Sequence, residues 1–204
     1  MNTKKLSRPP GRPRNFDPDQ AVAIAQRLFH TQGYDAVSVA NVTEALGINP
    51  PSFYAAFDNK AGLYARVLDR YACTDAIPLK DLLRSDRPVA DCLASVLEDA
   101  ARRYGADPET AGCLVLEGTH AEDPQARAAA CRFHAAAEEM IRAYIAERRP
   151  EKAGRLTDFV SLVMQGLSAK SRQGYTVDRL MDAARLASQA LADELRCGTD
   201  GSAR

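Results

Sequence analysis

Three side chains in the first third of the chain carry donors suited to phosphate groups: Ser38, Tyr54 and Lys60. Ser38 and Lys60 stand where helices are predicted to begin. Phe53 and Phe57 are four residues apart and take the buried face of one predicted helix, so Tyr54 falls off that face. An exposed phenol suits contact with phosphate oxygens. The alternative is that Tyr54 is an amphipathic packing residue whose hydroxyl reaches solvent.

The chain opens with a basic segment. Over the whole sequence 27 basic residues balance 27 acidic ones, so any excess is local. An unopposed basic arm favours a polyanionic partner, most often nucleic acid, with a solvated tail as the alternative. Five basic residues precede the first acidic one: Lys4, Lys5, Arg8, Arg12 and Arg14.

The second half of the chain contains a thiol, imidazoles and an aromatic ring that could meet a small effector: Cys113, His120, Phe133 and His134. Cys113 is the first candidate because Gly112 beside it permits a close approach. An accessible, acidified Cys113 would sense electrophiles, whereas Cys113, His120 and His134 together would sense a metal ion. The spacing favours neither, and core packing of the thiol with local bonding of the imidazoles is the alternative.

Motifs of catalysis are missing from the sequence. It has no phosphate-binding glycine loop, no His-Glu-x-x-His and no nucleophile elbow. No motif therefore supports the alternative of an enzyme that uses Cys113, Glu117 or His120. The five cysteines show no metal-ligand spacing and are odd in number, which indicates reduced thiols. We expect no cofactor, and no metal site is assigned. Neither a signal-peptide core nor a membrane span is recognisable, so the expected location is the cytoplasm.

The composition indicates an all-helical fold. Of the 204 residues 46% are hydrophobic and only 6% aromatic, and the chain is rich in alanine and poor in β-branched runs. A first helix is predicted from Pro18, capped by Asp17 and ended by Gly33. Its apolar stripe has helical spacing: Ala21, Ile24, Ala25, Leu28 and Phe29.

Two short helices follow the first. Ser38 caps one, which ends at Gly47, and Asn49 caps the other, with Pro50 in its first turn. Pro51 disfavours α geometry at Pro50, so the sequence leaves the exact first turn of this helix open. Short helices joined by a tight turn behind a packed helix are typical of a helix-turn-helix, with a plain helical hairpin as the alternative.

Longer helical patterns occupy the remainder, at about 58–73, 88–104, 109–119, 124–148, 152–173 and 177–196. The last two carry wide apolar stripes with small residues that permit close approach. We predict that they form one half of an intersubunit four-helix bundle, with packing inside the subunit as the alternative. The residues predicted at this dimer interface are Phe159, Val163, Leu167, Leu180, Ala184, Ala187 and Leu191.

Residues 38–63, SVANVTEALGINPPSFYAAFDNKAGL, combine a Ser start, a Leu-Gly-Ile turn, a Tyr between two Phe residues and an Asn-Lys helix opening. This segment resembles the signature of the TetR family of one-component regulators. The resemblance implies a three-helix DNA-binding domain, a larger helical ligand domain and a dimer built from the last two long helices. Shorter matches at 11–14, 111–113 and 165–166 resemble the branch that is similar to the copper-responsive repressor ComR.

Carried over by residue, the resemblance implies phosphate contacts by Ser38, Tyr54 and Lys60. It also implies that four residues face base edges: Pro50, Pro51, Ser52 and Ala55. The prolines and the alanine have no side-chain donor for a base, so only Ser52 and Asn49 offer polar contacts. Direct recognition of base edges is therefore expected to be limited.

The arm offers a second means of recognition. Its Arg-Pro-Pro-Gly-Arg-Pro-Arg run resembles an AT-hook core, an extended strip that fits the narrow minor groove of A·T-rich DNA. We expect Arg12 and Arg14 to supply part of the specificity.

These patterns predict a homodimeric, ligand-responsive transcriptional repressor that binds a palindromic operator and is released by a small-molecule or metal effector. Its expected parts are a flexible basic arm (1–15), a helix-turn-helix DNA-binding domain (16–60) and a larger helical domain for effector binding and dimerisation (61–204). The alternatives are an architectural DNA-binding protein without an effector and a small helical enzyme.

Overall fold

The structure is a computed structural model that describes residues 17–196. Within that range every regular element is a helix, which confirms the expected all-helical class. None of these helices combines the length and the apolar character that a bilayer crossing requires. The elements are α1 (Pro18–Gln32), α2 (Val39–Leu46), α3 (Pro50–Phe57), α4 (Lys60–Thr74), α5 (Leu79–Leu82), α6 (Val89–Gly105), η1 (Pro108–Thr110), α7 (Leu114–Gly118), α8 (Pro124–Ala146), η2 (Pro150–Lys152), α9 (Ala153–Arg172) and α10 (Val177–Arg196).

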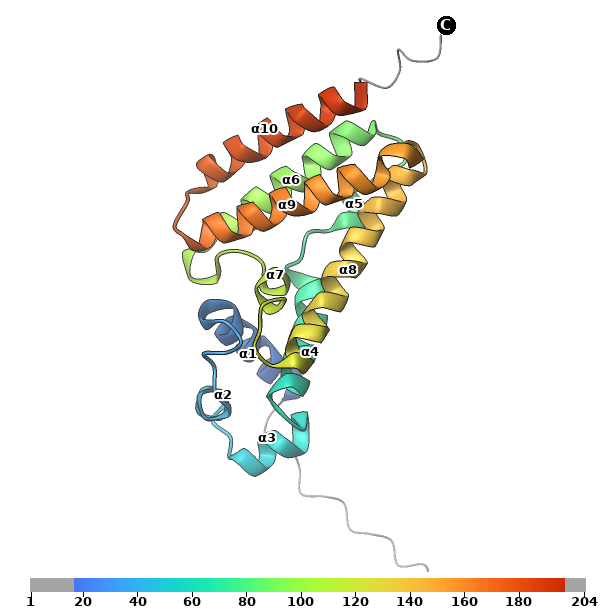
Figure 1. Ribbon diagram of the computed structural model, residues 1–204. Helices are drawn as coiled ribbons and strands as arrows, with labels where there is room; N and C mark the ends of the chain where they lie inside the picture. The colour runs from blue at the N-terminus through green and yellow to red at the C-terminus, as the bar shows by residue number, and fades with distance from the viewer. Residues whose placement is uncertain (1–16, 197–204) are drawn as a thin grey trace, which may run out of the picture.

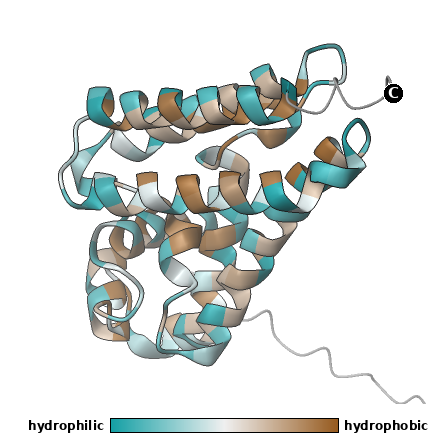
Figure 2. Cartoon of the chain, turned by 45° about the horizontal axis from the view of Figure 1, so that its top comes forward, coloured by the Kyte–Doolittle hydropathy of each residue, from teal (hydrophilic) through white to brown (hydrophobic). Residues whose placement is uncertain are grey.

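The molecule is elongated, with two helical layers at its ends (Figure 1). Helices α1 to α3 form one end, and α6, α9 and α10 lie side by side at the other. Helix α4 packs on both α1 and α8, and it therefore joins the small N-terminal helical domain to the larger one. Brown apolar residues alternate with teal polar ones along the helices, as amphipathic packing requires (Figure 2).

Side-chain caps start the first four helices, at Asp17, Ser38, Asn49 and Asn59. Each cap accepts a hydrogen bond from a backbone N–H of the first turn, which would otherwise lack a partner. Ser38 and Asn41 bond reciprocally in a capping box. The starts predicted for the first three helices are therefore confirmed, and the pattern predicted at about 58–73 is α4, whose cap is Asn59.

The buried face of α1 differs from the predicted stripe. Ala25 and Phe29 are buried, but Ile24 is 37% exposed, while Val22 and His30 are buried in its place. Helical periodicity requires one buried face but does not fix its centre, and packing of α1 on α4 sets that centre. The placement of Ile24 in the core was wrong.

The helix predicted at 109–119 is interrupted. Gly112 has φ +84°, a left-handed conformation, and the chain is extended at Ala111 and Cys113. A Cβ at Gly112 would lie 2.9 Å from Ser168 Oγ on α9, so the backbone approaches α9 as only glycine allows. The apolar pattern was helical, but this close packing breaks it into η1 and α7.

Candidate functional site

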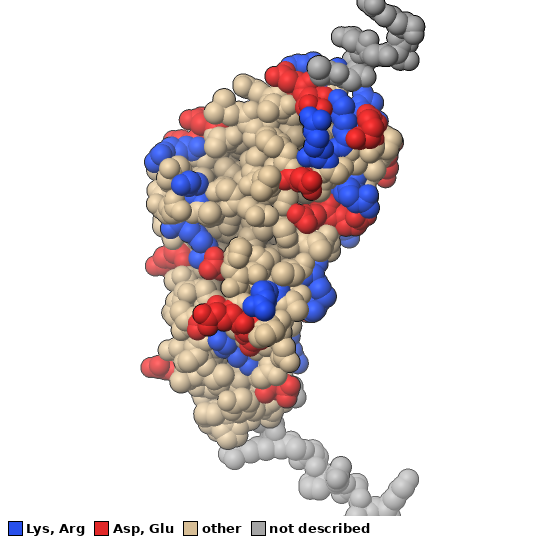
Figure 3. All heavy atoms as spheres, viewed as in Figure 1, with Lys and Arg blue, Asp and Glu red and all other residues tan. Residues whose placement is uncertain are grey.

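Helix α3 presents an uncharged outer face. Phe53 and Phe57 are buried, whereas Tyr54 is 52% exposed and stacks edge-on against Phe53 with 5.3 Å between ring centroids. The end of the molecule that α3 forms is mostly tan in Figure 3, with the blue basic groups set back from it. Four further residues predicted to face DNA also lie at the exposed or half-buried surface of α3: Pro50, Pro51, Ser52 and Ala55.

Two of the predicted contacts have structural tasks as helix caps. The hydroxyl of Ser38 accepts from Asn41 N at 3.1 Å and donates to Asn41 Oδ1 at 2.6 Å. The side chain of Asn49 accepts from Ser52 N at 2.9 Å. Both residues fix the start of the helices that would approach DNA, so their substitution would also disturb those helices.

Lys60 is bonded inside the N-terminal domain. Its Nζ donates to the carbonyl oxygens of Tyr34 at 3.1 Å and Val37 at 3.0 Å, and it lies 4.0 Å from the centroid of the Tyr34 ring. An ammonium has three donors, so two are occupied by the turn between α1 and α2. Lys60 therefore anchors this turn, and the sequence had indicated only a surface contact.

The charge of the N-terminal domain is unusual for a DNA-facing module. Residues 17–60 contain two basic side chains, Arg27 and Lys60, and five acidic ones: Asp17, Asp19, Asp35, Glu44 and Asp58. The predicted contacts Arg12 and Arg14 lie outside the described residues. Since the basic residues of the first 60 positions otherwise all precede Asn15, attraction to a phosphate backbone depends on that arm.

Two sets of hydrogen bonds fasten the N-terminal domain to the larger one. At the turn after α1, Tyr34 Oη donates to Asp123 Oδ2 at 2.8 Å, and the Asp35 carboxylate accepts from Glu122 N at 3.0 Å. Burial is the main reason that the pKa of Tyr34 is raised well above its ordinary value, and its bond to Asp123 adds to the rise. This phenol therefore stays protonated and donates.

The second set lies at the end of α1. His30 Nε2 lies 3.2 Å from Gly112 O, and Arg172 of α9 donates to His30 O at 3.4 Å. Cys113, which follows Gly112 in the chain, donates its backbone N–H to Ser168 Oγ at 2.9 Å. The Gly112–Cys113 segment is thus bonded to α1 on one side and to α9 on the other.

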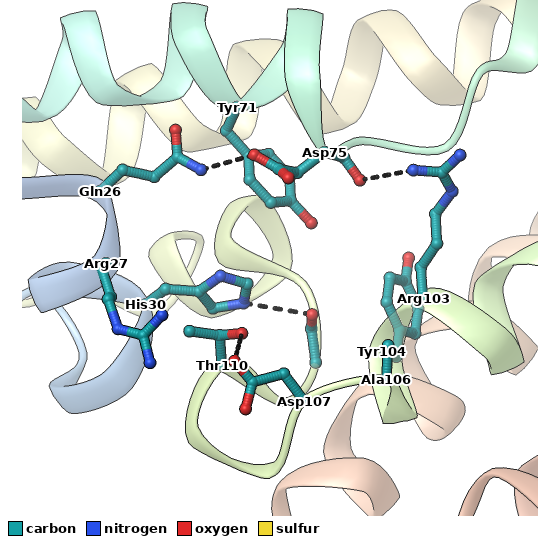
Figure 4. Close-up of a pocket in the computed structure, with 11 residues that line it drawn as sticks. Gln26, Arg27, His30, Tyr71, Asp75, Arg103, Tyr104, Ala106, Asp107 and Thr110 are labelled. Atoms are coloured by element: carbon teal, nitrogen blue, oxygen red, sulfur yellow. Dashed lines mark hydrogen bonds between the residues drawn. The ribbon is translucent and has the colours of Figure 1, made fainter. Parts of the chain in front are cut away.

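A pocket of about 380 Å³ opens at this junction between the domains. Figure 4 shows Gln26 and His30 reaching in from α1, Tyr71 and Asp75 from the end of α4, and Asp107 from the loop after α6. No sequence pattern indicated this site, since its residues come from three segments that only the fold brings together.

The four predicted effector residues have different surroundings, and none of them lines that pocket. Cys113 is 8% exposed, and its thiol interacts with Tyr71 and Tyr104, two residues that line the pocket. Burial is the main reason that the pKa of both tyrosines lies well above the ordinary value, and the neighbouring Cys113 raises it further. His120 is exposed in the loop after α7.

Phe133 and His134 lie on α8. Phe133 is half-buried against the core, and His134 Nε2 lies 3.3 Å from Ser161 Oγ of α9 and 3.5 Å from Glu138 Oε1. Across residues 17–196, no three His, Cys, Asp or Glu side chains are grouped to hold a metal ion. The metal site imagined from Cys113, His120 and His134 is therefore not assembled.

The residues predicted at a dimer interface divide into two groups. Leu167 of α9 is buried within the chain, as are Leu180, Ala184 and Leu191 of α10, and both helices pack on α6. For these four residues this is the packing inside the subunit that the sequence left open as the alternative, because an apolar stripe does not reveal which of its edges faces the core of its own subunit. Three residues keep some exposure: Phe159, Val163 and Ala187.

The outer face of α9 and α10 nevertheless carries large exposed apolar residues. Leu162 is 66% exposed and Leu186 is 67% exposed, and Leu162 was not part of the predicted apolar stripes. Between these helices lies a pocket of about 300 Å³. Its lining includes the small and apolar residues Val163, Gly166 and Ala183 together with Lys170, Tyr175 and Arg179. Large exposed leucines on adjacent helices are typical of a protein contact surface.

Comparison with known proteins agrees with this architecture. Residues 22–67 match the model of "Bacterial regulatory proteins, tetR family". The chain is 57% identical over 191 residues to the HTH-type transcriptional repressor BdcR of Escherichia coli K12, an alignment that covers 94% of this chain and 97% of BdcR.

ComR of the same strain, also an HTH-type transcriptional repressor, is 29% identical over 194 residues, covering 90% of this chain and 92% of ComR. BdcR is thus the more similar of the two, although the resemblance to ComR is confirmed. A solved structure of a CifR cysteine mutant bound to 26-bp operator DNA superposes with a TM-score of 0.79 at 29% identity, covering 88% of this chain and 99% of that one. Through this identity to BdcR, the matching family model and the shared fold, the chain belongs to the TetR family of bacterial regulatory proteins.

Proposed function

We propose that the protein is a transcriptional repressor that binds a palindromic operator as a homodimer and releases it when an effector binds the larger domain. The observation that carries this proposal is the exposed, uncharged face of α3 around Tyr54, at the end of a chain that is 57% identical to the repressor BdcR. The operator-bound CifR structure supports the same use of this fold. We assign the protein no catalytic role and place its action in the cytoplasm.

Helix α3 enters the major groove in this proposal. Tyr54 donates to a phosphate, Ser52 contacts a base edge, and Pro50, Pro51 and Ala55 meet thymine methyl groups. Ser38 and Asn49 hold the helix ends beside the backbone, and the remaining donor of Lys60 reaches a phosphate. Because these contacts carry little charge, Arg12 and Arg14 provide much of the affinity from the minor groove.

Dimerisation uses the exposed face of α9 and α10. Two copies of Leu162 and Leu186, with Phe159, Val163 and Ala187 beside them, form the apolar centre of an intersubunit four-helix bundle. The two α3 helices must then lie about 34 to 36 Å apart to enter successive major grooves. An effector acts by preferring a dimer with a different separation.

The larger domain offers Cys113 as one point of effector action. Its thiol lies between Tyr71 and Tyr104, and its backbone is tied to α9, so a bulky adduct would displace packed neighbours. His120, Phe133 and His134 are secondary effector candidates with separate surroundings.

Selection of bound duplexes from a random pool, followed by footprinting, tests the proposed function. A repressor protects a discrete palindrome, and Tyr54→Phe weakens binding to it by about tenfold through loss of a hydrogen bond to a charged group. Tyr175→Phe, on the far domain, is the matched control. Broad protection of A·T-rich tracts would indicate the architectural alternative, and no protection at low ionic strength would overturn the proposal.

A further inference from the structure

The pocket at the domain junction has walls from both domains. Gln26 and His30 belong to α1, Tyr71 and Asp75 to α4 and its end, and Asp107 to the loop that follows α6. Its volume of about 380 Å³ admits a small organic molecule. A ligand here would touch the N-terminal domain and the larger domain together.

Two carboxylates face this pocket without a cationic partner bonded to either. Asp75 accepts from Gln26 Nε2 at 2.7 Å and from Thr74 Oγ1 at 2.6 Å. Asp107 accepts from Glu109 N at 3.0 Å and from Thr110 Oγ1 at 3.1 Å. All of these donors are neutral, so both negative charges remain uncompensated by direct pairing.

Both carboxyl groups stay ionised. Burial acts to raise the pKa of Asp75, but its hydrogen bonds from Thr74 and Gln26 outweigh burial and leave the pKa below its ordinary value. The bond from Glu109 N is the main reason that the pKa of Asp107 is lowered. The pocket therefore keeps two negative charges at neutral pH.

The arginines at the rim are already paired. Arg27 bonds to Glu109 at 2.5 Å, and Arg103 bonds to Asp99 at 2.5 Å. Arg103 also donates to the backbone carbonyl of Asp75 at 3.3 Å, but not to its carboxylate. The charge of Arg27 contributes to the lowered pKa of Asp107, as that of Arg70 does for Asp75, but no guanidinium bonds directly to either carboxylate.

The remaining walls also favour a cation. Tyr71 and Tyr104 line the pocket with aromatic rings, which attract cations through their π faces. Burial is the main cause that lowers the pKa of His30, and the charge of Arg172 lowers it further. The imidazole is therefore neutral and does not compete as a cation. The volume of the pocket and its two aromatic rings suit an organic cation.

We propose that the pocket formed by Gln26, His30, Tyr71, Asp75, Tyr104 and Asp107 binds a small organic cation, and that this cation is an effector that releases operator DNA. The effector role rests on the proposed repressor function, while the binding site stands by itself. A cation drawn between Asp75 at the end of α4 and Asp107 on the loop after α6 changes the distance between these segments, and α1 moves with them through Gln26 and His30. That movement changes the orientation of the helix-turn-helix relative to the larger domain.

Three probes of similar size and different charge test the site on the full chain. Calorimetry would measure binding of benzyltrimethylammonium, 3-phenylpropan-1-ol and 3-phenylpropionate. We expect only the ammonium to bind, and we expect it to reduce operator affinity in fluorescence anisotropy. Preferential binding of the carboxylate, or binding of none of the three, would overturn the proposed site.

Charge-neutral variants locate the binding. Asp75→Asn and Asp107→Asn each keep the shape of the side chain and should weaken ammonium binding by about tenfold, as loss of one nearby opposite charge predicts. Asp69→Asn removes a charge from an exposed position of the same helix α4 and should leave binding unchanged. Equal affinities in all three variants would place the cation elsewhere and reject this pocket.

The two proposals fail separately. If the protein binds no operator, the repressor function fails, and calorimetry still decides whether the cation site exists. If the ammonium binds at Asp75 and Asp107 but operator affinity stays constant, the effector role is overturned while repression stands.

Discussion

The Nε2 atom of His30 lies 3.2 Å from the carbonyl oxygen of Gly112 and so joins the last turn of α1 to the loop before α7. A carbonyl can only accept, so Nε2 carries the proton and donates. Burial is the main cause that lowers the pKa of His30, and Arg172 lowers it further, against the Gly112 bond and the charges of Asp75 and Asp107.

This lowered pKa predicts how stability depends on pH. An imidazole with a folded pKa below the ordinary 6.5 is protonated more readily when unfolded. Its contribution to the free energy of unfolding is therefore complete above pH 6.5 and is lost as the pH falls towards and through the folded pKa. We expect His30→Gln to flatten this decline in urea titrations between about pH 7.5 and pH 5, and to cost about 1 kcal/mol at the upper end. His120→Gln, at an exposed histidine, should keep the wild-type slope, and the same slope in His30→Gln would refute the assignment.

Lys60 should contribute to stability as well as to DNA binding. Replacement in Lys60→Met leaves the carbonyls of Tyr34 and Val37 without their charged donor. The expected loss in free energy of unfolding is about 2 kcal/mol, measured by chemical denaturation without DNA. Lys80→Met on the surface of α5 is the control and should change stability little. Unchanged stability in Lys60→Met would restore a purely DNA-facing role.

The basic arm should dominate the salt dependence of operator binding. A chain truncated to begin at Asn15 lacks five of the seven basic residues in the first 60 positions. We expect weaker binding and a salt slope that is shallower by roughly 0.9 for each phosphate that the arm no longer neutralises. Replacing both Arg12 and Arg14 by Gln should weaken operator binding more than replacing both Lys4 and Lys5 by Gln. If truncation leaves both affinity and slope intact, the arm takes no part.

The exposed leucines of α9 and α10 should hold the dimer together. Leu162→Glu combined with Leu186→Glu places four carboxylates in the proposed interface and should raise the dimer dissociation constant by roughly a hundredfold or more. Sedimentation velocity measures this constant. Ile24→Glu, at an exposed apolar residue of α1, is the control and should remain dimeric. A double variant that stays dimeric would move the interface to another face.

Electrophile sensing by Cys113 predicts a selective loss of response. Cys113→Ser should bind operator normally but resist release by N-ethylmaleimide, because the sulfur that the reagent alkylates is gone. Release by copper and by zinc is measured in parallel. Cys131→Ser, at an exposed thiol of α8, is the matched control and should respond as the wild type does. A full response of Cys113→Ser to every agent would remove Cys113 as a sensor.

The boundaries of the first four helices followed from single residues of the sequence. Asp17, Ser38, Asn49 and Asn59 each cap the helix that follows, because a short polar side chain satisfies N–H groups only a few residues away. The exposure of Tyr54 was equally predictable, since Phe53 and Phe57 on one face of a short helix leave it on the other.

Tertiary contacts decided the remainder. No local rule places Ser168 of α9 against Gly112, and this contact is what interrupts the helix predicted at 109–119. Packing of α10 on α6 likewise decided that Leu180 and Leu191 belong to the subunit core while Leu186 faces outward.

The same division applies to the candidate sites. The surface of α3 could be found from residues 49 to 57, because those residues are neighbours in the chain. Asp75 and Asp107 are 32 positions apart and meet His30 only where α1, α4 and the loop after α6 converge. Local hydrogen bonding and periodicity are properties of short segments, whereas the charge of a pocket depends on which distant segments the folded chain packs together.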